Sequence, residues 1–281
     1  MTTAPSWSSW TLDPLVLVLV VAAAVLYGDA YRRARGRAAV RRPNIGHWLP
    51  YYAGLVLFAL ALMSPLDAIG DRWLLSAHMF QHVLLADISP ALIVLGLRAP
   101  LLPLGLTRKG LQLVAPRGPV GRVLNAVIRP LVVLPLWALA TWFWSVPAVF
   151  DFAAAHSGVH ALEHITLFYT GLALWWLVID PLPSDRRNAN GRRLAYLGFT
   201  RVATAFVCIP LTWAGSTFYS LYANAPRGYG LSPLADQQLA GASMCFLELL
   251  VFGIAFAVVF VDTLSQDAKR NELVDRLEAG A

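Results

Sequence analysis

The sequence predicts an all-α polytopic membrane protein, a seven-transmembrane-helix bundle with its N-terminus outside and its C-terminus in the cytoplasm. Of the 281 residues, 58% are hydrophobic and 14% are charged, whereas an average soluble protein has about 45–50% and about 25%. The mean hydropathy of +0.59 agrees. A soluble fold must cover itself with polar groups, so this composition excludes one and makes the lipid bilayer the main solvent.

Seven apolar runs are long enough, or nearly so, to cross the hydrocarbon core as helices, which takes about 20 residues. They are Leu15–Tyr31, Trp48–Met63, Leu74–Leu97, Leu131–Pro147, His156–Ile179, Leu194–Phe218 and Gln237–Val261. Because no Lys or Arg precedes the first run, we expect it to be kept as a span and not cleaved as a signal peptide. We expect residues 1–262 to form one transmembrane domain and residues 263–281 a polar cytoplasmic tail.

Lys and Arg are distributed unevenly between the loops. Nineteen lie on one side of the predicted spans and two, Arg72 and Arg227, on the other, with Arg201 inside the sixth span. Basic residues accumulate in cytoplasmic loops, so the side that is poor in them faces outward. The net charge of +6 and the pI of about 9.6 therefore reflect topology, and no nucleic-acid partner is expected.

Five of the six histidines lie at the outer ends of the third and fifth spans. His78 and His82 are one turn apart on one helix face, and His156, His160 and His164 climb one face of the other helix over about 12 Å. Imidazoles at this spacing chelate metal ions. Polar groups in lipid are costly and usually functional. We therefore predict that these five histidines form a metal site.

Further residues near these ends are expected to assist as oxygen or sulfur ligands or as partners of the histidines. They are Asp67, Met79, Glu163, Asp236, Met244 and Cys245. Glu163 would accept the second N–H of a histidine. Helix capping explains Asp67 and Asp236 equally well, and core packing is the favoured account of the methionines and cysteines. Cys208 and Cys245 lie in apolar segments and are not expected to form a disulfide framework.

Three ionisable residues inside predicted spans have no single assigned role. Asp87 lies about 140° from His82 around an ideal helix, so we expect its partner to come from a different neighbouring helix. Asp87 and Glu248 are interpreted either as parts of a proton path or as hydrogen bonds between helices. The role of Arg201 is left open.

Two other interpretations of the histidines stay open. Histidines on neighbouring helices bind haem iron axially in electron-transfer proteins, and one histidine from each of the two spans would suit. The segment His160-Ala161-Leu162-Glu163-His164 also matches the H-x-x-E-H pattern, in which two histidines bind zinc and the glutamate activates water. A zinc hydrolase is the weaker alternative, because no third protein ligand is identifiable.

Four short motifs occur in a characteristic order. They are Ser64-Pro65-Leu66-Asp67, His78-Met79-Phe80-Gln81-His82, His160-Ala161-Leu162-Glu163-His164 and Asp236-Gln237-Gln238-Leu239-Ala240-Gly241. Together they resemble the CtaG-type cytochrome c oxidase assembly factors of bacteria, over roughly the second to seventh spans. The resemblance implies a multi-pass protein of the bacterial plasma (inner) membrane that helps to mature a haem–copper oxidase, with copper delivery the usual proposal.

The residues and the resemblance lead to one hypothesis. Cu(I) prefers imidazole and soft sulfur ligands, and both residue types gather at the outer ends of the spans. We expect a non-enzymatic assembly factor that binds copper, receives it from a periplasmic copper donor and presents it to a cytochrome c oxidase subunit. Haem and zinc remain the alternative cofactors.

Overall fold

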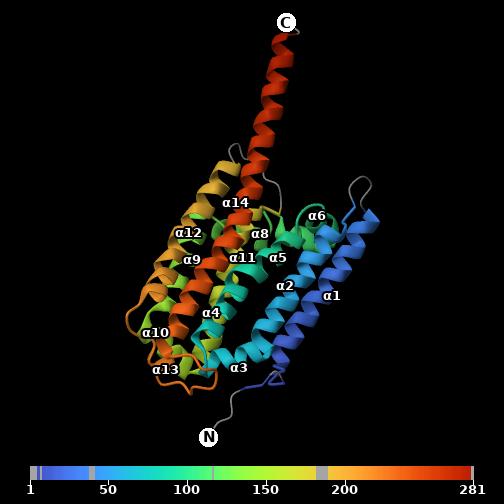
Figure 1. The fold of residues 1–281 in the computed structure, drawn as a ribbon. Coiled ribbons are helices and arrows are strands. Elements are labelled where there is room, and N and C mark those ends of the chain that lie inside the picture. The colour runs from blue at the N-terminus through green and yellow to red at the C-terminus, as the bar shows by residue number, and fades with distance from the viewer. Residues whose placement is uncertain (1–4, 7, 38–41, 116, 182–188, 280–281) are drawn as a thin grey trace.

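The computed structural model describes residues 5–6, 8–37, 42–115, 117–181 and 189–279, which form helices and connections without any strand (Figure 1). Five of the described helices are long and continuous: α1 (Pro14–Arg37), α2 (Ile45–Met63), α11 (Ser157–Ile179), α12 (Ala189–Trp213) and α14 (Pro233–Ala279). Three segments in direct succession make another long rod: α4 (Leu75–Val83), the π-helical turn η1 (Leu84–Ile88) and α5 (Ser89–Gly96). The predicted all-helical architecture is confirmed.

The remaining helices are shorter. They are α3 (Pro65–Arg72), α6 (Leu101–Gly105), α7 (Arg108–Val114), α8 (Pro119–Val127), α9 (Pro130–Ser145), α10 (Pro147–Ala155) and α13 (Ser220–Ala223). By length and hydropathy, the described residues contain six candidate membrane spans, or seven if the stretch Arg108–Val127 and α9, bent by 59°, count as one. The number of spans predicted from the sequence, seven, therefore agrees with the upper of these two counts.

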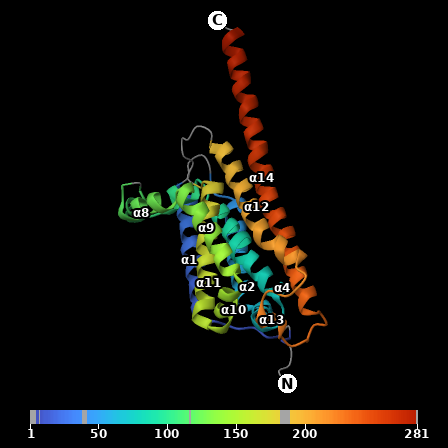
Figure 2. The same ribbon diagram turned by 90° about the vertical axis from the view of Figure 1, so that its left-hand side faces the viewer.

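The helices form two flanks around a central pair. α1 and α2 lie side by side on one flank and α12 and α14 on the other, with the α4–α5 rod and α11 between them (Figure 1). α3, α10 and α13 gather at one end of the bundle, which we call the α3 end. α8 projects sideways near the opposite end (Figure 2). Trp137 of α9 packs with Trp175 of α11 and Phe252 of α14, so the short α9 belongs to the bundle.

Two helices differ in extent from the predicted spans. α12 begins five residues before the start of the predicted sixth span and ends five residues before the end of that span. α14 begins at Pro233 and runs for 47 residues, so the described part of the predicted polar tail continues it as a helix beyond the bundle (Figure 1). The stretch after Gly253 contains neither Gly nor Pro up to Ala279. It is rich in helix formers, so no residue stops the helix where the polarity changes.

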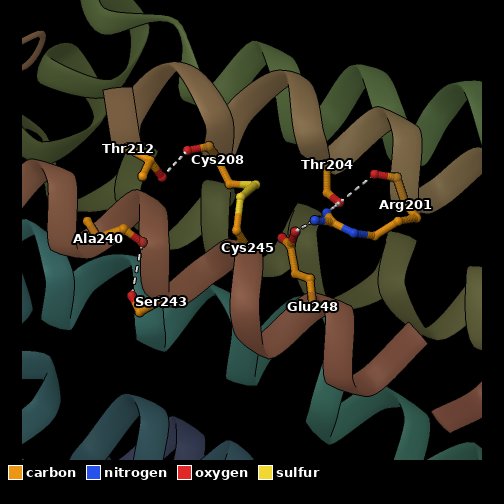
Figure 3. Close-up of a disulfide and its surroundings, with 8 residues drawn as sticks. All are labelled: Arg201, Thr204, Cys208, Thr212, Ala240, Ser243, Cys245 and Glu248. Atoms are coloured by element: carbon orange, nitrogen blue, oxygen red, sulfur yellow. Dashed lines mark hydrogen bonds and ion pairs between the residues drawn. A yellow bond between two sulfur atoms is a disulfide. The ribbon is translucent and has the colours of Figure 1, made fainter. Parts of the chain in front are cut away.

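A disulfide joins α12 to α14, contrary to the expectation for the cysteines. Cys208 and Cys245 are bonded, with their Cα atoms 5.4 Å apart (Figure 3). Gly241, one turn away on α14, explains the close approach, since a Cβ atom there would lie 2.5 Å from the backbone nitrogen of Thr212. Hydropathy alone does not reveal which helix faces meet, so this disulfide could not be predicted from the sequence.

Candidate metal centre

Four histidines meet at the α3 end of the bundle, two from α4 and two from α11. Within each helix the ring centroids are 4.4 Å apart for His78 and His82 and 4.3 Å apart for His160 and His164. Between the helices, His78 stacks on His160 at 5.2 Å, and His82 lies 5.5 Å from His164. The i,i+4 spacing puts each pair on one helix face, and packing turns the two faces toward each other. We call these residues the histidine group.

Two overlapping sets of ligand atoms lie in the histidine group and beside it. One set comprises His78, His160 and His164, the other His78, His82 and Glu163, and within each set the ligand atoms lie within 4.8 Å of one another. Two ligand atoms on one ion, with bonds of about 2.0–2.1 Å, are at most about 4.2 Å apart. Small side-chain rotations therefore suffice to close either set around an ion. His78 belongs to both.

The ring nitrogens of the group differ in their partners. The Nε2 atoms of His78 and His82 are 2.9 Å apart and share a hydrogen bond. The buried Nε2 atoms of His160 and His164 have no hydrogen-bond partner among the described residues. Buried polar atoms nearly always have a hydrogen-bond partner. Two buried imidazole nitrogens without one, on residues of the same ligand set, are therefore available to bind a metal ion.

Tyr222 of α13 determines the tautomer of His78. Its hydroxyl donates to the backbone oxygen of Gly70 in a short hydrogen bond, and it lies 3.0 Å from Nδ1 of His78. A hydroxyl has one hydrogen, so it accepts the second bond from an Nδ1–H. Burial raises the pKa of Tyr222, and Asp71 adds to the shift, so the hydroxyl stays protonated. Nε2 of His78 is then left with its lone pair free for His82 or for a metal ion.

Two carboxylates flank the histidine group. Oε1 of the buried Glu163 lies 3.6 Å from Nε2 of His82, so the partner of this glutamate is on α4 and not on its own helix. This oxygen has no hydrogen bond among the described residues. Asp71 of α3 lies 3.8 Å from Nδ1 of His160 and is partly exposed. The group therefore has a buried acid on one side and a more open acid on the other.

His156 lies outside the histidine group. It occupies the junction between α10 and α11, where its extended backbone interrupts the helical phase. Nδ1 of its exposed ring donates a hydrogen bond of 2.8 Å to the backbone oxygen of Phe152 instead. The uninterrupted face assumed from the sequence therefore holds only for His160 and His164.

Asp236 is a helix cap for a helix far away in the sequence. Its carboxylate accepts hydrogen bonds from the backbone N–H of Leu75 at 2.6 Å, from that of Ser76 at 3.1 Å and from the Ser76 hydroxyl at 2.5 Å. Negative charge at a helix N-terminus is favourable. Of the two accounts of this residue, capping is the one seen, and it holds the first turn of α4, where His78 lies.

Asp67 positions α4 by a different route. Its Oδ1 accepts from the amide of Gln81 at 2.7 Å, and the same amide donates to the backbone oxygen of Ala61 at 2.8 Å. Burial raises the pKa of Asp67 to about 6, although the Gln81 hydrogen bond opposes the shift. Asp67 thus ties α3 to the helix turn that carries His82 without entering either ligand set.

The sulfur residues divide into two kinds. Met79 and Met244 are buried, and both line a cavity beside His82. Cys245 is consumed by its disulfide with Cys208, so it offers no thiolate. Among the described residues, the soft atoms near the histidine group are therefore thioethers.

The sequence did not predict that Tyr222 and Gly70 contribute to the surroundings of His78. Tyr222 is 144 positions from His78 and lies in the short helix α13, in a part of the sequence without a motif. Asp71 was visible only as an acid in the same loop as Asp67. The one available signal is that all these residues lie in connections on the side predicted to face outward.

Comparison with known proteins agrees with this architecture. The family model described as "Cytochrome c oxidase caa3 assembly factor (Caa3_CtaG)" matches residues 25–266. Two uncharacterized proteins, one of Mycobacterium bovis and one of Mycobacterium tuberculosis, are each 26% identical over 270 residues, which cover 89% of this chain and 39% of theirs. The chain thus spans about two fifths of the length of these relatives. No solved structure matches it.

The family match covers six of the seven predicted spans completely and part of the first, and it includes every member of the histidine group. The residues that hold the group in place, from Asp67 to Asp236, also lie within the match. On this ground the chain belongs to the cytochrome c oxidase caa3 assembly factor family.

Proposed function

We propose that this assembly factor binds copper as Cu(I) in the histidine group and delivers it to a cytochrome c oxidase subunit. The observation that carries the proposal is the pair of overlapping ligand sets that share His78. An ion can pass from one set to the other by exchanging two ligands while the third stays bound. Such a site favours transfer over storage, because a closed four-ligand cage would retain its metal.

The charge distribution supports delivery on the outer side of the plasma membrane. The connections at the α3 end include Arg72 and Arg227, whereas the opposite loops and the tail contain nineteen Lys and Arg. By the positive-inside rule, the histidine group then opens toward the periplasm. There it would meet a periplasmic copper donor and the oxidase subunit that accepts the ion.

The composition of the pocket favours Cu(I) over the alternatives. Imidazoles with nearby thioethers suit a soft monovalent ion, and one positive charge is cheaper to bury than two. Ring centroids 5.2–6.1 Å apart between α4 and α11 leave no room for a haem macrocycle between the two helices. Glu163 faces His82 and not a gap between His160 and His164, which argues against the zinc hydrolase.

The test is metal binding by the purified protein in detergent, with Cu(I) held by a competing chelator. His78→Ala removes a ligand of both sets and is expected to weaken binding most, ahead of His164→Ala, which affects one set. His156→Ala is the matched control, since this histidine starts the same helix but lies outside the group. Copper binding that survives alanine at His78, His82, His160 and His164 would refute the proposal.

The same preparation distinguishes the alternatives. A Soret band in the visible spectrum that disappears in His78→Ala would favour a haem protein. Bound zinc, with peptide cleavage abolished by Glu163→Gln, would favour a hydrolase. For the delivery step, the His78 variant is expected to lower the copper content of the assembled oxidase in cells, while His156→Ala leaves it unchanged.

A further inference from the structure

A small cavity lies next to the histidine group, on the side away from the α3 end. Its volume is about 30 Å³, enough for about two water molecules. Besides His82, its lining includes two carboxyl groups, Asp87 of η1 and Glu248 of α14, and the hydroxyl of Thr204. Water in this cavity would connect the metal site with acids deep in the membrane.

The π turn explains why Asp87 reaches this cavity. In an α-helix, Asp87 would point about 140° away from His82. In η1 the backbone N–H of Ser89 bonds to the oxygen of Leu84, five residues back. A side chain five residues on therefore returns close to the same face, and His82 and Asp87 line one cavity. π turns occur frequently at functional sites.

The charges beside the cavity do not balance. Asp87 and Glu248 are 3% and 2% exposed. Arg201 of α12 lies 3.7 Å from Oε2 of Glu248 and donates to Thr204 (Figure 3). One cation thus faces two acids, and Oδ1 of Asp87 has no hydrogen-bond partner among the described residues. A buried carboxylate without a partner is strongly unfavourable.

Within the described part of the chain, the other elements around the cavity supply no second cation. α9 contributes the hydroxyls of Thr141 and Ser145 together with Trp137 and Trp144, and α11 contributes Leu167 to the lining. The described titratable or charged groups at the cavity are His82, Asp87 and Glu248, with Arg201 adjoining. Because Arg201 pairs with Glu248, Asp87 is the acid that has no cation beside it among the described residues.

We propose that Asp87 holds a proton in the metal-free protein and releases it when a monovalent metal ion enters the histidine group. In this step the ion binds the imidazoles, the O–H bond of the Asp87 carboxyl breaks, and the proton leaves through the cavity water to bulk solvent. The carboxylate that remains, about one helix turn from His82, balances the new cation. The buried charge of the protein is then the same before and after binding.

This coupling rests on the proposed function, and it predicts how metal binding depends on pH. One proton released per ion makes the affinity rise up to tenfold per pH unit over the range in which Asp87 titrates. The acid pair would thus let a periplasmic pH change load or unload the site. Arg201 and Glu248 act as positioning residues, since they keep the proton on Asp87.

The first experiment is infrared spectroscopy of the metal-free protein. A protonated carboxylic acid gives a carbonyl-stretching band that shifts in D2O. We expect this band in the wild-type protein and its loss in Asp87→Asn, whose amide has the shape of the neutral acid. Glu248→Gln should remove the band as well, because Arg201 then takes the ionised Asp87 as its partner. A wild-type minus Asp87→Asn spectrum without such a band would overturn the proposal.

The second experiment measures proton release during titration with Ag(I), which has the charge and ligand preference of Cu(I) without its redox chemistry. The wild-type protein is expected to release up to one proton per ion more than Asp87→Asn does, and the affinity of the variant should depend less steeply on pH. Asp262→Asn, an acid on the same helix as Glu248 but away from the cavity, is the control and should behave as wild type.

The outcomes separate the two proposals. Ag(I) binding with equal proton release in the wild type and in Asp87→Asn would overturn the coupling and leave the metal site intact. Failure of the wild-type protein to bind Ag(I) or Cu(I) would remove the proposed function and the coupling together. In that case the infrared band would still report whether Asp87 carries a proton.

Discussion

The substitution Asp236→Asn should disturb the metal centre from a helix that contributes no ligand to it. The wild-type carboxylate is 3% exposed and accepts three hydrogen bonds from the first residues of α4. Hydrogen bonds to charged groups contribute about 1.5–3 kcal/mol each, and loss of an N-cap costs about 0.5–2 kcal/mol. Asparagine keeps one acceptor and turns an N–H toward a donor. We expect the free energy of unfolding to fall by about 2–4 kcal/mol.

The metal affinity should fall with it. His78 is the fourth residue of α4, so a loosened first turn displaces the ligand that both sets share. A tenfold weaker affinity corresponds to about 1.4 kcal/mol, and at least this much is expected. The assays are denaturant unfolding in detergent and Cu(I) competition at one pH.

Asp13→Asn is the matched control for this substitution. Asp13 caps α1 by accepting hydrogen bonds from the backbone N–H groups of Leu15 at 2.7 Å and Val16 at 3.1 Å, but it is exposed, and α1 contributes no residue to the histidine group. It should cost about 0.5–1 kcal/mol and leave the metal affinity unchanged. If Asp236→Asn proves no more harmful than Asp13→Asn, the reasoning about the cap is wrong.

Three further tests address the packing and the titration of single groups. Burial raises the pKa of Asp67 from 3.8 to about 6, so between these pH values the folded state binds a proton that the unfolded state has lost. The free energy of unfolding should therefore fall as pH rises from about 4 to 6, by up to about 3 kcal/mol in total. Asp67→Asn should remove this decline from pH-dependent unfolding curves, and an unchanged profile would contradict the assignment. Replacing both Cys208 and Cys245 by serine opens a loop of 37 residues, which should cost about 4 kcal/mol in unfolding free energy and make the melting temperature insensitive to reductant; persistent sensitivity would locate the effect elsewhere. Gly241→Ala forces a Cβ to within 2.5 Å of the α12 backbone and should destabilise the fold by about 1–3 kcal/mol, whereas Gly253→Ala on the same helix meets open space and should be neutral or stabilising.

Helical periodicity in the sequence predicted much of the candidate site. The i,i+4 pairs His78/His82 and His160/His164 follow from helical spacing alone, and they meet as expected. The same reasoning failed at His156, because it assumed that the helix continues past a junction where the backbone is extended. It also failed at Asp87, because a π turn changes the angular position of every residue after it.

Contacts between distant segments were beyond reach of that reasoning. The cap from Asp236 to Leu75 spans 161 positions, and the hydrogen bond between Tyr222 and His78 spans 144. The disulfide between Cys208 and Cys245 depends on which faces of α12 and α14 meet. The pattern of a single sequence does not predict such contacts, because each depends on how whole helices rotate and tilt against one another.

The sequence by itself determined that the chain is a helical membrane protein, which side of it is rich in cations, and which helix faces carry imidazoles. These properties depend on composition and on spacing within one turn, where geometry is nearly invariant. Only the tertiary structure decided that the two imidazole faces meet, that Tyr222 orients His78, and that Asp87 opens into a cavity beside His82. The reason is physical, because packing in a bundle selects one rotation of each helix from many that have the same hydropathy.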